Sequence, residues 1–145
     1  MKDLLLWSEN LAIGHPGLDT EHRHMLDLIN EVITVVGFNG DPSAQLKTLR
    51  GLAVEHVGNE NRILWQLQAG TLELLKEHPG MRKILKMMAR SRINDHMTEH
   101  HGFLARLDVI VRNGANTLCE ELRGWFLDHA LSYDAGLKEI FETIR

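Results

Sequence analysis

The chain has 145 residues, 43% of them hydrophobic, which suits a single domain over residues 1–145 whose core can bury roughly two-thirds of the unfolded surface. Its formal net charge of -4 excludes the basic footprint of a nucleic-acid-binding protein and a polybasic membrane patch, and no apolar run is long enough for a signal peptide or a membrane span. Cys119 is the single cysteine, so no disulfide framework exists and we expect a cytoplasmic protein.

The N-terminal part of the chain predicts an arm followed by a helix. Residues 1–18 are expected to be extended, because two glycines and a proline lie within their last five positions. A first helix follows, with Asp19 or Thr20 as its cap and Gly37 or Gly40 as its stop. Its apolar residues recur with helical spacing at Met25, Leu28, Ile29, Val32, Ile33 and Val36.

Three further helices are predicted from their start and stop signals. Pro42 and Ser43 open the second helix, which Gly70 ends. A short leucine-rich piece covers 71–76, and a long helical pattern then runs from about 81 to 111. Thr117 and Glu120 form a capping-box signature for a last helix that continues toward Ile144. No strand pattern or repeat is present, so the predicted fold class is all-α.

Seven residues on these four helical segments have side chains suited to a dinuclear metal site. They are His22, His56, Glu60, His96, His100, His129 and Asp134. A step of four residues turns an α-helix by about 400°, so His56 and Glu60 share one face, as do His96 and His100. A helix bundle builds its metal sites from such inward-pointing side chains on facing helices. The conjunction of four segments predicts one central site, although each pair alone is a weak signal.

The spacing of His129 and Asp134 requires irregular backbone. Five residues place them about 140° apart on a regular helix, so they would not meet at one ion. A local π-turn realigns them, and such turns occur mostly at functional sites. We therefore predict a π-turn between Ala130 and Asp134.

These motifs together resemble those of bacterial hemerythrins, over nearly the whole chain and in the family's order. The matching stretches are Trp7, Gly14, Leu18-Asp19-Thr20-Glu21-His22, His56-x-x-x-Glu60, His96-x-x-Glu99-His100-x-x-Phe103 and Trp125-x-x-x-His129-x-x-x-x-Asp134. The resemblance implies an up-down four-helix bundle around a non-haem di-iron centre that binds O2 reversibly. It also implies a division of the ligands: His96, His100 and His129 on one iron, His22 and His56 on the other, and Glu60 and Asp134 as bridges.

Coordination arithmetic agrees with that division. If two octahedral ions share two carboxylates and one oxo or hydroxo bridge, the ion with three histidines is full and the other keeps one open position for a small molecule. Five imidazoles and two carboxylates also differ from the carboxylate-rich di-iron oxidases, whose ligands follow a Glu-x-x-His pattern. A carrier or sensor of O2 is therefore favoured over an oxygenase.

One departure from the family is the length of chain between the second and third ligand motifs. Residues 61–95, 35 in all, separate Glu60 from His96, where the family has a short turn. The second and third helices are therefore elongated or carry an inserted segment. Residues 81–90 within it are amphipathic, so this stretch either covers its own core or contacts a protein partner or a second copy of the chain.

Other readings remain open at this point. The same site could serve an enzyme acting on peroxide or nitric oxide, and the bundle could instead store metal or serve only as an interaction module. Glu99 is either an outer partner of a ligand imidazole or a solvated residue, and Asp19 is either a helix cap or an outer partner. Four histidines have no place in the pattern and are expected to be solvated or packing residues: His15, His24, His78 and His101.

Overall fold

The protein is described by a computed structural model over residues 4–69, 90–114, 117–133 and 138. Four α-helices and two short helical turns are found in these ranges, and no strand. In chain order the elements are η1 (Glu9–Leu11), α1 (Pro16–Gly37), α2 (Ser43–Ala69), α5 (Arg90–Asn113), α6 (Leu118–Asp128) and the π-helix η2 (His129–Tyr133). The prediction of an all-helical bundle is confirmed.

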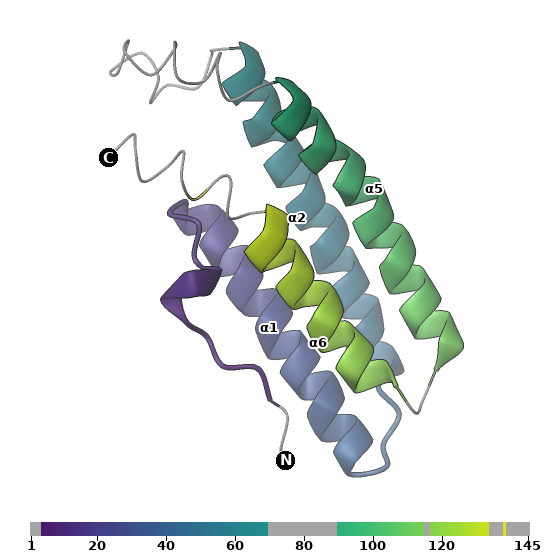
Figure 1. Ribbon diagram of the computed structural model, residues 1–145. Coiled ribbons are helices and arrows are strands. Elements are labelled where there is room, and N and C mark those ends of the chain that lie inside the picture. The colour runs from purple at the N-terminus through teal and green to yellow at the C-terminus, as the bar shows by residue number, and fades with distance from the viewer. Residues whose placement is uncertain (1–3, 70–89, 115–116, 134–137, 139–145) are drawn as a thin grey trace.

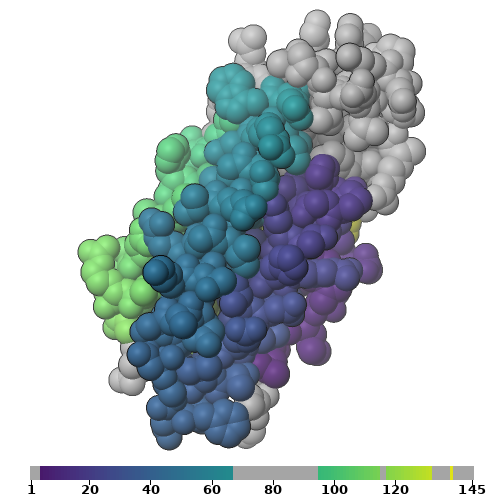
Figure 2. Space-filling model, turned by 180° about the vertical axis from the view of Figure 1, so that it is seen from behind, coloured from purple at the N-terminus to yellow at the C-terminus, as the bar shows by residue number. Residues whose placement is uncertain are grey.

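The four helices pack side by side in a ring, so that each has two neighbours (Figure 1). α1 contacts α2 and α6, and α5 contacts the same two helices. Seen from the opposite face, α2 lies between α1 and α5 (Figure 2). The core between them is apolar and includes the fully buried side chains of Met25, Ile29, Leu49, Phe103, Leu107, Leu122 and Phe126. The bundle therefore has one interior into which all four helices project residues.

The first helix begins earlier than the sequence suggested, so the arm is shorter than predicted. Pro16 occupies the first turn of α1, where its missing N–H costs no hydrogen bond. The Nδ1 atom of His15 accepts a hydrogen bond from the Leu18 amide at 3.2 Å and caps the helix. Asp19 is therefore not the cap. Its carboxylate accepts hydrogen bonds from the amides of Ile13 and Gly14, at 2.7 and 3.3 Å.

The remaining helix boundaries agree with the sequence signals where they are described. α1 ends at Gly37, and Gly40 follows in a turn where a side-chain carbon would lie 2.9 Å from a methyl group of Val35. α2 starts at Ser43, whose amide is bound by Asp41. α5 ends at Asn113 and Gly114 follows with φ of 69°, the left-handed conformation that favours glycine.

The last helix changes its pitch at the residue that carries the predicted ligand. Thr117 is the N-cap of α6, as predicted, but its side chain makes no capping hydrogen bond. At His129 the α-helix gives way to a π-helix that runs to Tyr133. The predicted backbone irregularity is confirmed for these residues, whereas Asp134 lies outside the described part of the chain.

Several other predictions also fall outside the described residues. These are the piece at 71–76, the start of the long helix at 81–89 with most of the amphipathic stretch 81–90, and the continuation toward Ile144. Among the helices that are described, none is both long and apolar enough to cross a membrane.

Candidate metal centre

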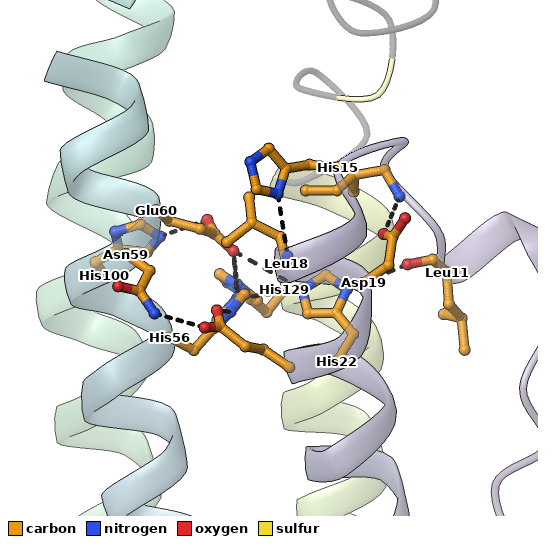
Figure 3. A network of polar contacts seen from close by, with 12 residues as sticks. Leu11, His15, Leu18, Asp19, His22, His56, Asn59, Glu60, His100 and His129 are labelled. Atoms are coloured by element: carbon orange, nitrogen blue, oxygen red, sulfur yellow. Dashed lines mark hydrogen bonds and ion pairs between the residues drawn. The ribbon is translucent and has the colours of Figure 1, made fainter. Parts of the chain in front are cut away.

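Five histidines and one glutamate meet in the interior of the bundle. They are His22 on α1, His56 and Glu60 on α2, His96 and His100 on α5, and His129 at the start of η2. All six are buried, and the most exposed of them, His96, is 5% exposed. Figure 3 shows side chains from α1, α2, α5 and η2 converging on this point. Six of the seven predicted ligands are thus brought together. The seventh, Asp134, lies outside the described part of the chain.

The Glu60 carboxylate is the centre of the cluster, and its two oxygens face different histidines. Oε2 lies 2.9 Å from Nε2 of His96 and 3.0 Å from Nε2 of His100. Oε1 contacts Nε2 of His56, and lies 3.3 Å from Nε2 of His129 and 3.8 Å from Nε2 of His22. One carboxylate therefore joins two sets of imidazoles, which is the geometry of a bridging ligand.

The helical repeat explains how each pair reaches the centre. His56 and Glu60 are one turn apart on α2, and His96 and His100 are one turn apart on α5, so each pair projects from one face. Because α2 and α5 contact each other, the two faces meet. His22 on α1 and His129, which directly follows α6, complete the cluster.

Four of the imidazoles are held by an oxygen on the side away from Glu60. Nδ1 of His22 lies 3.1 Å from the Leu11 carbonyl, and Nδ1 of His56 lies 2.8 Å from Oε1 of Glu21. Nδ1 of His100 lies 2.6 Å from Oδ1 of Asn61. Nδ1 of His129 lies 3.0 Å from Oε2 of Glu99. Carbonyl oxygens and ionised carboxylates only accept hydrogen bonds, so these contacts place the ring hydrogen on Nδ1 and leave Nε2 as the ligand atom.

The Nε2 atoms of three histidines are so close to one another that a proton or a metal ion must lie between them. Nε2 of His22 lies 3.2 Å from Nε2 of His56, which lies 3.3 Å from Nε2 of His129. Two lone pairs repel at such distances unless a proton or a metal ion lies between them. The donor set fits a metal ion, and the ligand atoms form the groups His22, His56, Glu60 and His129, and Glu60, His96 and His100.

The charges of the metal-free cluster follow from the same contacts. Burial raises the pKa of Glu60, but the neighbouring imidazoles, His56 first, lower it well below its ordinary value of 4.5. Burial lowers the pKa of His56, but the Glu60 carboxylate and the hydrogen bond to Glu21 raise it above 6.5. Both shifts favour the anion of Glu60 and the cation of His56, and a metal ion that binds Nε2 of His56 must displace any proton held there.

Aromatic side chains cover the imidazoles on the α5 and α6 sides. The ring centroid of Phe103 lies 4.1 Å from that of His129, and Trp125 stacks on the other face of Phe103, also at 4.1 Å. The indole N–H of Trp125 donates to the Phe103 carbonyl at 2.8 Å. The rings of Phe126 and His22 are nearly perpendicular, with their centroids 6.0 Å apart. These apolar contacts keep water away from the cluster.

The ring of His129 lies between the two pairs of histidines, and its Nε2 atom faces the pair of His22 and His56. Its ring centroid lies 5.5 Å from the centroids of both His56 and His100, and 6.1 Å from those of both His22 and His96. Its Nε2 atom contacts the Oε1 side of Glu60. In the described residues His129 therefore stands between the two pairs of histidines.

The sequence pattern does not identify most of the residues that hydrogen-bond to the candidate ligands. Glu99, for which the sequence leaves open a role as an outer partner, contacts His129. Glu21, Asn61 and the Leu11 carbonyl were not assigned that role, because each contacts a ligand from a different element. His24 and His101 are exposed, as expected, and His15 is a helix cap. His78 lies outside the described residues.

Comparisons of the chain with protein-family models, with curated proteins and with solved structures give no significant match.

Proposed function

We propose that this chain is a cytoplasmic non-haem di-iron protein that binds O2 reversibly, with the fold and site of a bacterial hemerythrin. The observation that carries the proposal is the bridging position of Glu60. Its two oxygens face two sets of imidazole nitrogens, and a buried carboxylate with five histidines is a donor set that suits a pair of first-row transition metal ions.

The fold that we propose is an up-down four-helix bundle with an elongated or inserted segment between α2 and α5. Residues 38–42 join α1 to α2, and residues 114–117 join α5 to α6. Links of this length connect antiparallel neighbours, and the contacts between α1 and α2 and between α5 and α6 agree with them. The twenty residues 70–89 between α2 and α5 would form the inserted segment.

The ligand division that we propose keeps His22 and His56 on one ion and His96 and His100 on the other. His129 would complete the second set, which requires its Nε2 atom to turn away from Oε1 of Glu60, the oxygen that it contacts in this structure. Glu60 and Asp134 would bridge the two ions. The paired iron ions would supply the electrons that hold O2 when it binds. The protein would keep the pocket dry through Phe103 and Phe126, since water promotes loss of reduced oxygen species and leaves the oxidised centre.

Binding is favoured over turnover by the state of the nearby acids. Glu21 and Glu99 reach the cluster, and both are engaged: Glu21 by His56 and Asn59, and Glu99 by His129 and Arg106. Glu60 is surrounded by imidazoles. Among the described residues, Glu21 and Glu99 are therefore occupied in holding ligand imidazoles, and Glu60 would itself be a ligand. None of the three is available as a proton donor to a bound substrate.

The direct test is metal content combined with an optical spectrum under air and after anaerobic reduction. We expect two irons per chain and a charge-transfer band that appears with O2 and disappears when O2 is removed. His22→Ala should abolish the reversible change, whereas His24→Ala, an exposed histidine on the same helix, should leave it intact. A wild-type protein without stoichiometric iron, or one whose iron spectrum ignores O2, would overturn the proposal. Turnover of peroxide or nitric oxide in place of reversible binding would favour an enzyme.

A further inference from the structure

A chain of charged contacts runs from the surface of the bundle to His129. The guanidinium Nη2 of Arg106 donates to Oε1 of Glu99 at 3.1 Å, and Oε2 of Glu99 lies 3.0 Å from Nδ1 of His129. The side chain of Glu99 is 4% exposed, whereas that of Arg106 is 48% exposed. Arg106 therefore contacts the carboxylate that holds a candidate ligand.

The helix geometry fixes Arg106 in this place. It follows Glu99 by seven residues on α5, which is two turns along the same face. Its Nη1 atom also donates to Oδ2 of Asp128 on α6 at 3.4 Å. Asp128 immediately precedes His129. The guanidinium thus links α5 to α6 at the level where the ligand projects into the core.

The energetics of Glu99 require such a partner. An ionised carboxylate that is nearly buried is stable only when charges or hydrogen bonds compensate for its lost hydration, and a guanidinium is a strong donor to a carboxylate. Without Arg106, Glu99 would gain free energy by turning toward the solvent. The Nδ1 atom of His129 would then lose its acceptor.

The site shows the same arrangement at a second histidine. Glu21 accepts from His56, and Asn59 donates to the other Glu21 oxygen at 2.5 Å. In both places a third residue fixes the carboxylate that fixes the imidazole. Outer partners of this kind set the tautomer and orientation of a ligand and affect metal affinity.

We propose that Arg106 is a positioning residue for the metal centre, which holds Glu99 against Nδ1 of His129 and so presents Nε2 of His129 as a ligand. This inference rests on the proposed function, because it requires that His129 binds metal. Loss of Arg106 should therefore weaken metal binding, whereas the loss of its positive charge alone would strengthen it. Removing a nearby positive charge favours a bound cation, whereas losing the orientation of His129 weakens binding.

The test is titration of the metal-free protein with Co2+, followed by its visible spectrum. Arg106→Gln should weaken Co2+ binding by on the order of tenfold, the low end of the range for outer partners, and Glu99→Gln should weaken it by at least as much. Arg106→Lys should recover part of the affinity, because it keeps one donor to Glu99. Arg50→Gln is the matched control, since Arg50 is 53% exposed and pairs with Asp108 away from the cluster. Its affinity should equal that of wild type.

A second measurement works without any metal. In nitrogen-15 NMR spectra of the histidine rings, wild-type His129 should carry its hydrogen on Nδ1, and Arg106→Gln should show both tautomers while the Arg50→Gln spectrum is unchanged. Co2+ binding by Arg106→Gln that equals or exceeds wild type, or an unchanged His129 tautomer, would overturn the inference while the metal site stands. Failure of wild type itself to bind Co2+ would overturn the proposed metal site and this inference with it.

Discussion

Glu60 has the most unusual surroundings of any residue in the described structure. It is fully buried and its two oxygens contact imidazoles that come from all four sides of the bundle. A carboxylate in such a place is stable only if positive charge surrounds it. In the metal-free protein the raised pKa of His56 favours a compensating proton on that ring, and in the loaded protein the charge would come from the metal ions.

Glu60→Gln tests this central position. The amide keeps the shape of the side chain but removes the charge that both ions would share, so we expect the iron content to fall from two per chain to less than one. Glu55→Gln is the control, because Glu55 is exposed on the same helix. Elemental analysis after loading with Fe2+ and gel filtration checks the prediction. Retention of two irons by Glu60→Gln would show that this carboxylate is not a ligand.

The protonation of His56 makes the stability of the metal-free protein depend on pH. Burial lowers the pKa of His56, but Glu60 and Glu21 raise it above 6.5 overall. Stabilisation from a raised pKa is complete below the unfolded value and is lost as the pH rises through the folded value. The thermal unfolding temperature of the metal-free protein should therefore fall as the pH rises above about 6.5.

Thermal unfolding with excess chelator, followed across that pH range, measures this effect. His56→Gln should flatten the alkaline side of the profile, and His24→Gln should leave it unchanged because His24 is exposed. At the acid end the sign reverses: the lowered pKa of Glu60 contributes stability above pH 4.5 that is lost as the pH falls through its folded value. An unfolding temperature that rises steadily with pH through the neutral range would contradict the proposed charge on His56.

At the scale of single residues, the sequence predicts the candidate ligands better than the residues that hydrogen-bond to them. Pairs one helical turn apart, such as His56 with Glu60, can be found from spacing because a regular helix fixes their geometry. The contact of His56 with Glu21 joins residues 35 positions apart, and the contact of His100 with Asn61 joins residues 39 positions apart. Such contacts depend on how helices rotate against each other, which no local pattern records.

Among the elements, the N-terminal arm has a direct connection to the site. The Leu11 carbonyl holds Nδ1 of His22, and the arm itself is fastened at both ends. The Asn30 side chain accepts from the Leu5 amide at 2.7 Å and donates to the Leu5 carbonyl at 2.8 Å. Asp19 binds the amides of Ile13 and Gly14 near the start of α1. The N-terminal arm is thus held at Leu5 and at Ile13, and its Leu11 carbonyl between these points positions the ring of His22.

Asn30→Ala should loosen the attachment of the N-terminal arm to α1. The variant loses both hydrogen bonds to Leu5, and we expect the free energy of unfolding to fall by about 1 to 3 kcal/mol. The backbone amide of Leu5 should exchange its hydrogen faster, and the amides in the middle of α2 should not. Asn113→Ala, at an exposed position, is the control. Unchanged exchange at Leu5 in Asn30→Ala would show that these hydrogen bonds do not hold the arm.

Element boundaries were predicted well where a residue has one strong conformational preference. Gly114 follows the end of α5 with φ of 69°, which favours glycine, and α2 begins at Ser43 directly after Pro42. The predicted cap of α1, Asp19 or Thr20, lies four or five residues after the observed cap, His15. Proline and glycine discourage a helix interior, but proline is favoured in a first turn. The π-helix at 129–133 was predicted only because a functional spacing required it, and local propensity gives no such signal.

At the scale of the whole molecule, the candidate metal site lies where all four helical segments meet. Each segment contributes at least one ligand candidate, so ions bound there would hold together parts of the chain that separate on unfolding. Ligands that bind only the folded state stabilise it in proportion to their excess over the dissociation constant. The bundle without metal must instead keep a buried carboxylate among imidazoles with no bound cation beside it, which is costly.

Metal loading should therefore raise the unfolding temperature of the entire bundle in one cooperative step. With metal at about one hundred times its dissociation constant, the gain is about 2.7 kcal/mol for each independent site. Calorimetry of the metal-free and Fe2+-loaded protein under anaerobic conditions measures it. A double variant, His22→Ala with His96→Ala, should lose most of the gain, whereas His24→Ala with His101→Ala should keep it. Equal unfolding temperatures with and without metal would mean that no site spans the helices.

The central claim is that two metal ions lie on the two sides of Glu60, and anomalous diffraction from crystals of the iron-loaded protein tests it most directly. Two iron peaks are predicted, roughly 3.5 to 4 Å apart as in other paired metal sites, one beside Nε2 of His22 and His56 and the other beside Nε2 of His96 and His100, with one Glu60 oxygen directed at each. A single peak, or iron bound only outside the bundle, would contradict it.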